Sequence, residues 1–206
     1  MITAYKDLTI KKYKEIMAIS DMETEDIDKQ VKLISILSDF TEDDVYNLPL
    51  DKYGEYVDNL SFLFKEPKPL TRLPDTITLG DVKYIVLKRV DRMTAGQYID
   101  LQTYMKENLG VEYILSTILI PKGKRYGDYD PIDVVSDISE YLDVETAMGI
   151  AFFLHKKLEY TIRGSLRYLD WMMRILKRKN PKIKEKLEEA RMQLKRLEES
   201  GIGYIW

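Results

Sequence analysis

The chain has 206 residues, of which 45% are hydrophobic and 33% charged, so it has the composition of a water-soluble globular protein and wholesale disorder is excluded. It contains no Cys and a single His, which excludes a disulfide scaffold, a Cys-ligated zinc site, a thiol nucleophile and a His-rich metal site within one chain. The net charge is only −3, and 15 Tyr stand against 5 Phe. Because Tyr combines an apolar ring with a hydroxyl, this excess suits half-buried surfaces and interfaces.

The first third of the chain predicts helices. Apolar residues at three- and four-residue spacing indicate helices over residues 8–19, 27–37 and 51–64. Thr41 is expected to cap a short turn, with Asp44 as its capping partner. Two prolines, Pro67 and Pro69, cannot continue a helix. We therefore expect an acidic N-terminal helical subdomain over residues 1–66.

The middle of the chain predicts a β-hairpin followed by helices. Residues 76–87 are rich in β-branched side chains and carry Gly-Asp at their centre, as in a tight hairpin turn. Thr94 is expected to cap a helix over residues 95–107, which the segment Asn108-Leu109-Gly110 would close with a left-handed C-terminal cap. The mostly apolar run 111–120 is expected to be a helix or a strand, with helix favoured, and a further helix is expected over 132–142 after a polar loop. Residues 67–142 would form a hairpin-plus-helices subdomain.

The last third predicts two long helices. Asp143 can cap a helix that runs to about residue 179, with an apolar front that includes Phe152 as a core residue. Pro181 restarts a second helix up to residue 199. Residues 143–206 are thus expected to form long basic helices with an apolar tail. The predicted fold class is mainly α: a helical bundle with one small β-hairpin (about 76–87) and a long C-terminal helical hairpin.

Charge is unevenly distributed along the chain. Residues 1–75 carry 10 basic and 16 acidic side chains, whereas residues 155–196 carry 14 basic and 5 acidic ones. The acidic front and the basic back could attract each other within one chain or between copies. The basic side chains could also hold nucleic-acid phosphates, although acidic residues are interspersed among them. This possible basic surface consists of Lys156, Lys157, Arg163, Arg167, Arg174, Lys177, Arg178 and Lys179.

Three other features are candidates for metal binding, phosphate binding or catalysis. Asp128, Asp130 and Asp133 form a carboxylate cluster, but they lack the remaining ligands of a calcium loop and suit a solvated turn with helix N-terminal acids. The glycines of the loop 121–131 do not have phosphate-loop spacing. His155 has no Ser or Asp at motif spacing and is expected to be structural or on the surface. We predict no catalytic residue, metal or cofactor.

The final residues form an apolar tail after Gly201. Ile202, Tyr204, Ile205 and Trp206 would leave apolar surface in water unless they pack on the chain's own helices or on a partner. We expect these four residues to bind a partner. The first residues lack the basic and apolar regions of a signal peptide, and the charge-free stretches 113–121 and 146–155 are too short to span a bilayer. We therefore expect no membrane association.

The order of several segments resembles a known protein class. A Leu-Thr-Ile-Lys-Lys-Tyr opening precedes residues 33–38 and 41–45, the hairpin around Gly80, the helix start Met93 to Leu101, and the loop Gly123 to Asp130. This order resembles tail-region and tail-assembly proteins of tailed bacteriophages, especially those of the crAss-like and related Bacteroidetes phages. The resemblance covers about residues 5–160.

The resemblance implies a function without catalysis. It implies a virion structural protein, a connector or tail component, that docks near the portal or tail with other phage structural proteins and with multiple copies of itself. Such a protein would be assembled in the host cytoplasm and belong to the virion. Two alternatives stay open: a cytoplasmic tail-assembly chaperone, and a nucleic-acid-binding module that uses the basic C-terminal helices.

Overall fold

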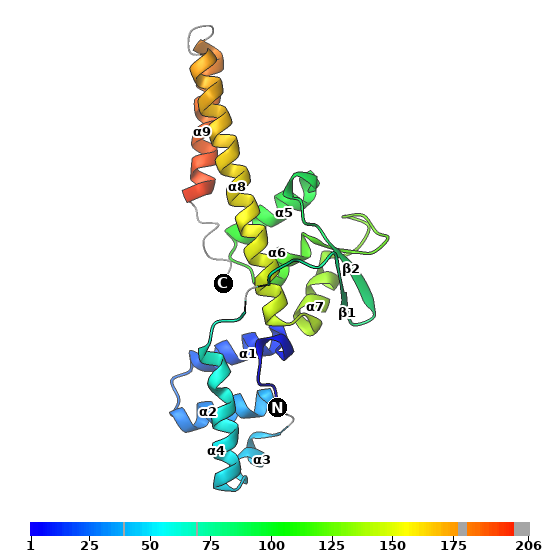
Figure 1. Ribbon diagram of the computed structural model, residues 1–206, viewed down its shortest axis with the longest axis vertical. Coiled ribbons are helices and arrows are strands. Elements are labelled where there is room, and N and C mark those ends of the chain that lie inside the picture. Colours follow the sequence, from blue (N-terminus) through cyan, green and yellow to red (C-terminus); the bar gives the residue numbers. More distant parts are fainter. Residues whose placement is uncertain (39, 69, 177–180, 200–206) are drawn as a thin grey trace.

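The computed structural model describes residues 1–38, 40–68, 70–176 and 181–199, with side chains described except at 168, 171–185 and 197–199. Figure 1 shows three parts along the long axis: a lobe of N-terminal helices, a middle lobe with the sheet, and a projecting pair of long helices. The predicted mainly α fold, with its hairpin and its long C-terminal helical hairpin, is confirmed. No helix in the described ranges combines the length and apolar character needed to span a membrane.

The N-terminal lobe contains α1 (Ile10–Ser20), α2 (Asp26–Leu37), α3 (Glu42–Tyr46), α4 (Leu50–Asn59) and the 3₁₀ helices η1 (Tyr5–Asp7) and η2 (Leu60–Phe64). The predicted Thr41–Asp44 capping box is confirmed. The predicted helix to residue 64 is wrong after Asn59, where the backbone tightens to 3₁₀. In that geometry the two buried residues Leu60 and Phe62 lie about 120° apart around the axis rather than about 160°, so both can face the core.

The predicted hairpin is part of a three-stranded antiparallel sheet in the order β1 (Thr76–Leu79), β2 (Val82–Val86), β3 (Leu119–Pro121). Gly80 has φ 54°, a left-handed conformation that favours glycine in the two-residue turn. The expected helix over 111–120 is wrong in its second half: α6 (Val111–Ser116) ends and β3 pairs with β2, with Val86 opposite Leu119. Periodicity alone cannot distinguish a buried helix from a buried strand in such an apolar run.

The rest of the middle lobe consists of η3 (Val90–Arg92), α5 (Ala95–Lys106) and α7 (Pro131–Tyr141). Thr94 caps α5 as predicted, and Gln97 completes the capping box. Asn108 takes the left-handed conformation at the end of α5 with φ 53°, whereas Gly110 has φ −59°. The predicted left-handed C-terminal cap is therefore confirmed, and Asn108 is the residue that forms it.

The C-terminal hairpin consists of α8 (Val144–Leu176) and α9 (Pro181–Glu199), which pack side by side in Figure 1. The predicted cap of α8 is confirmed, because Asp143 Oδ1 accepts a hydrogen bond of 2.8 Å from the backbone N–H of Thr146. Asp170 and Arg191 join the two helices by an ion pair of 2.7 Å. The hairpin therefore has a cross-link between described side chains.

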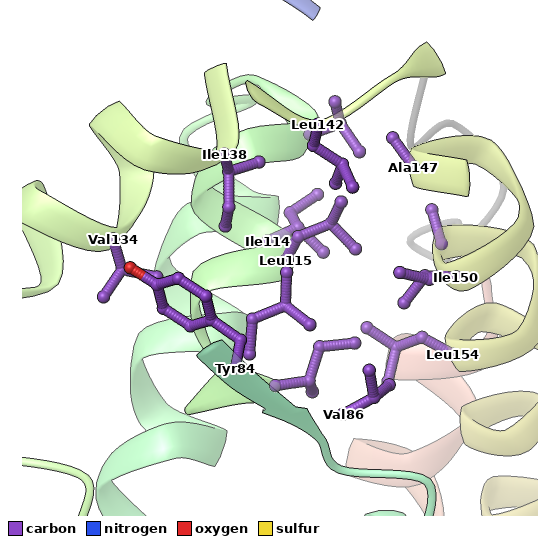
Figure 2. Close-up of a cluster of buried hydrophobic side chains, with 14 of the residues drawn as sticks. Tyr84, Val86, Ile114, Leu115, Val134, Ile138, Leu142, Ala147, Ile150 and Leu154 are labelled. Carbon is purple, nitrogen blue, oxygen red and sulfur yellow. The ribbon is translucent and has the colours of Figure 1, made fainter. Parts of the chain in front are cut away.

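Two hydrophobic cores lie in the two lobes, and α1 and α8 contribute to both. Ile16 and Val144 belong to the lower core, whereas Ile10 and Ile150 belong to the upper one. Figure 2 shows the upper core, where residues of α6, α7 and α8 face one another across the inner side of β2. The three subdomain ranges expected from the sequence stay predictions, and α8 is the element that joins the lobes.

Several tyrosines connect elements within the chain, which the sequence alone did not predict. Their hydroxyls donate hydrogen bonds to side chains or carbonyls on other elements: Tyr5 to Leu63, Tyr46 to Asp28, Tyr53 to Gln30, Tyr84 to Asp137, and Tyr126 to Asp100. A hydroxyl on a half-buried ring needs such a partner. Part of the Tyr excess therefore serves the fold itself, where the sequence had suggested interfaces.

Tyr84→Phe should change the response to alkali. Burial, and next the hydrogen bond to Asp137, raise the pKa of Tyr84 well above its usual value. The unfolded chain releases this proton near pH 10, whereas the folded chain keeps it. The contribution of Tyr84 to the unfolding free energy is therefore fully present below pH 10 and is lost as the pH rises above 10. Urea unfolding should show that the fall in unfolding free energy above pH 10 is shallower in the variant by about 1.4 kcal/mol per pH unit.

At neutral pH the same variant should lose about 1.5–3 kcal/mol, the contribution of a hydrogen bond to a charged acceptor, here Asp137. Tyr98→Phe, which removes a hydroxyl from an exposed ring, is the matched control. An unchanged alkaline slope in Tyr84→Phe would show that the Tyr84 proton is not held by the folded state.

Candidate docking groove beside helix α8

A groove of about 610 Å³ runs along α8 where this helix leaves the middle lobe. One wall is a face of α8 and the other is the segment before β1, together with Lys88 after β2. Two aromatic side chains on α8 stand out in water, with Phe152 56% and Tyr160 78% exposed. The lining residues are Leu70, Thr71, Arg72, Leu73, Lys88, Gly149, Phe152, Phe153, Lys156, Lys157 and Tyr160.

Helical periodicity places the α8 residues of the groove on one face. Positions 149, 152, 153, 156, 157 and 160 follow three- and four-residue steps, so their side chains align along the helix. Ile150, Ala151 and Leu154 are buried in the upper core instead. The prediction that Phe152 is a core residue is therefore wrong. Phe152 lies at the edge of the buried stripe of α8 and faces the groove.

Gly149 allows the second wall to come close to α8. A Cβ on this residue would lie 2.3 Å from Cγ of Leu70, which is far below an ordinary contact. The absence of a side chain at this point therefore lets Leu70 rest directly on the helix. Leu73, on the same segment, is buried in the upper core and ties this wall to the lobe.

The described groove lining carries basic side chains and no acidic ones. Lys156 Nζ lies 5.0 Å from the centre of the Phe152 ring, and Lys157 Nζ lies 5.3 Å from that of Phe153. Each such contact contributes about 0.5–1 kcal/mol at an exposed site. Lys88 donates to Asp75 at 2.6 Å, and this hydrogen bond lowers the pKa of the Asp75 carboxyl. The groove thus presents aromatic surface beside positive charge.

The predicted basic surface coincides with the groove only in part. Lys156 and Lys157 line it, whereas Arg163 forms an ion pair of 2.6 Å with Glu159 and Arg167 is exposed farther along α8. The side chain of Arg174 and the whole of Lys177, Arg178 and Lys179 lie outside what the structure describes. Ile202, Tyr204, Ile205 and Trp206, expected to bind a partner, also lie outside the described residues.

Two carboxylates of the cluster in the loop before α7 accept hydrogen bonds from backbone N–H groups. Asp128 accepts a hydrogen bond of 2.9 Å from the backbone N–H of Arg125, and Asp130 caps α7 through the N–H of Ile132 at 2.9 Å. Within the described ranges, no group of three or more acidic or His side chains is arranged to hold a metal ion. His155 is half-buried, and its buried Nδ1 has no hydrogen-bond partner among the described residues.

An ion pair between an exposed lysine of α1 and a buried carboxylate of α6 was not predicted from the sequence. Lys14 Nζ lies 2.5 Å from Oε1 of Glu112, whose side chain is only 4% exposed. The second carboxylate oxygen, Oε2, is buried and has no hydrogen-bond partner in the part of the chain that the structure describes, and Glu112 borders a small pocket of about 220 Å³. The available signal was a single acidic residue at the start of the apolar run 111–120.

Comparisons with known proteins give no match: no protein-family model, no curated protein and no solved structure matches the chain. The sequence indicated Lys156 and Lys157, but it could not indicate Leu70 or Arg72, because these residues reach α8 only through the tertiary fold.

Proposed function

We propose that the protein is a non-enzymatic bacteriophage structural protein that docks with other proteins near the portal or tail of the virion. The observation that carries this proposal is the groove on α8, in which Phe152 and Tyr160 are exposed next to Lys156 and Lys157. The resemblance of residues 5–160 to phage tail-region proteins supplies the biological setting.

The composition of the groove fits protein recognition. Aromatic side chains and Arg are enriched in protein interfaces, and they provide most of the strong binding contacts. A partner that covers Phe152 and Tyr160 would remove apolar ring surface from water, at about 25 cal/mol per Å². The neighbouring amines of Lys156 and Lys157 favour a partner that is acidic at its rim.

The test is recovery of the chain from purified phage particles. We expect mass spectrometry of particles to find it in a constant number of copies per virion. Abundance in the infected-cell lysate with no recovery from particles would support the tail-assembly chaperone and contradict the virion role. The two functions are separated by this result, because both use the same kind of docking surface.

Deleting residues 201–206 provides a second test of docking. The segment lies outside the described residues and contains four large apolar side chains within six positions. We expect the deletion to abolish incorporation into particles, while circular dichroism of the isolated chain stays unchanged. Particles with normal copy numbers would contradict a docking role for the tail.

A further inference from the structure

We propose that the groove binds the acidic segment 21–28 of a second copy of the same chain, so that copies join head to tail. This inference rests on the proposed docking function and names the partner of its groove. Its occupant is a part of the protein that the structure describes.

The segment 21–28 has the chemistry that the groove requires. It contains five acidic residues and no basic one in eight positions, between the end of α1 and the first turn of α2. Its two large apolar side chains are exposed, with Met22 at 40% and Ile27 at 60%. The segment therefore exposes apolar side chains between carboxylates, and the groove exposes aromatic rings beside lysine amines. The two surfaces are complementary in charge, and both carry apolar side chains.

The dimensions also agree. Phe152 and Tyr160 are separated by eight helical residues, or about 12 Å along α8. Met22 and Ile27 are five residues apart, which spans at most about 17 Å of extended chain. The two apolar side chains can thus reach both rings while Glu23 and its acidic neighbours lie near the lysines.

The arrangement of the fold favours a partner copy over the chain's own segment. Figure 1 shows the connection between α1 and α2 at the outer side of the lower lobe, whereas the groove part of α8 (yellow) lies above that lobe. One chain therefore presents the segment at one place and the groove at another. Two different surfaces that bind each other make a heterologous interface, which produces closed rings or open filaments. Both assemblies occur as repeated components of large particles.

The test uses two full-length variants that each lose one side of the interface. The groove variant carries Phe152→Ala and Lys156→Ala, and the segment variant carries Glu23→Gln and Ile27→Ala. A control variant, Ile132→Ala with Lys122→Ala, removes one exposed large apolar side chain and one Lys from the middle lobe, outside both proposed surfaces. Light scattering at low salt gives the molar mass of each chain and of a 1:1 mixture of the first two.

We expect the wild type and the control to form multimers that dissociate in 1 M salt, where the Debye length is about 3 Å. Each of the two interface variants should be monomeric when measured alone, because its self-association should be at least tenfold weaker than that of the wild type. Their mixture should stop at two chains, because one intact groove meets one intact segment.

Other outcomes would overturn the inference. A monomeric wild type, a segment variant with the wild-type mass, or a mixture that stays monomeric would each exclude the head-to-tail interface. If the multimer dissociates when residues 201–206 are deleted but persists in the segment variant, the groove binds the apolar tail instead. If the wild type binds an oligonucleotide and only the groove variant loses this binding, the groove binds nucleic acid instead. The docking function itself is judged separately, by recovery from particles.

Discussion

Replacing Ile150 by Ala is expected to lower the free energy of unfolding by about 2–5 kcal/mol, the range for a large aliphatic side chain removed from a packed core. Ile150 is fully buried on the inner face of α8, where Figure 2 shows it between Ala147 and Leu154. For a chain of this size, each kcal/mol shifts the melting temperature by about 2–4 °C. Thermal and urea unfolding should both detect the loss.

Phe152→Ala is the matched control, only two residues away on α8. Because Phe152 faces the groove and is exposed, its truncation should lower the unfolding free energy by no more than about 1 kcal/mol, the upper contribution of its contact with Lys156. The two variants should therefore separate stability from docking. An equal loss in both would show that Phe152 belongs to the core after all and that the groove face of α8 is wrongly assigned.

The second large effect is expected at Gly149. A Cβ there would lie 2.3 Å from Leu70 Cγ, so Gly149→Ala must push the segment before β1 away from α8. Overpacking of this kind costs about 1–3 kcal/mol, which urea unfolding can measure. The displaced segment carries Arg72, so we expect association through the groove to weaken as well.

Gly164→Ala gives the control within the same helix. Apart from the backbone of its own helix, no atom of the described residues lies within 4 Å of a Cβ placed on Gly164, so Ala should stabilise the helix by roughly 0.5–1 kcal/mol. The two substitutions are chemically identical and should have opposite signs. Stabilisation by Gly149→Ala would contradict the contact between Leu70 and α8.

The local features of the fold were predictable because their causes are local. Thr41, Thr94 and Asp143 cap helices through groups within three residues, and Gly80 turns a two-residue hairpin. The strand β3 was not predictable in this way, because Leu119 becomes a strand residue only by pairing with Val86, which is distant in sequence. Short apolar runs acquire their structure from the partner they meet.

The site shows the same division between local and distant causes. Charge counts pointed to Lys156 and Lys157, which do line the groove. Whether Phe152 faces the core or the solvent depends on which side of α8 the middle lobe covers, and periodicity placed it on the wrong side. The opposite wall, with Leu70 and Arg72, is separated from α8 by more than 70 positions, and no pattern in the sequence joins them.

The most direct test of docking through the groove is the copy number of variants in purified particles. Quantitative mass spectrometry should find the control variant (Ile132→Ala, Lys122→Ala) at the wild-type copy number. We expect the groove variant (Phe152→Ala, Lys156→Ala), which keeps the buried face of α8, to be incorporated at least about tenfold less, as the loss of about 1.4 kcal/mol of binding free energy requires. Incorporation of the groove variant at the wild-type level would contradict docking through the groove.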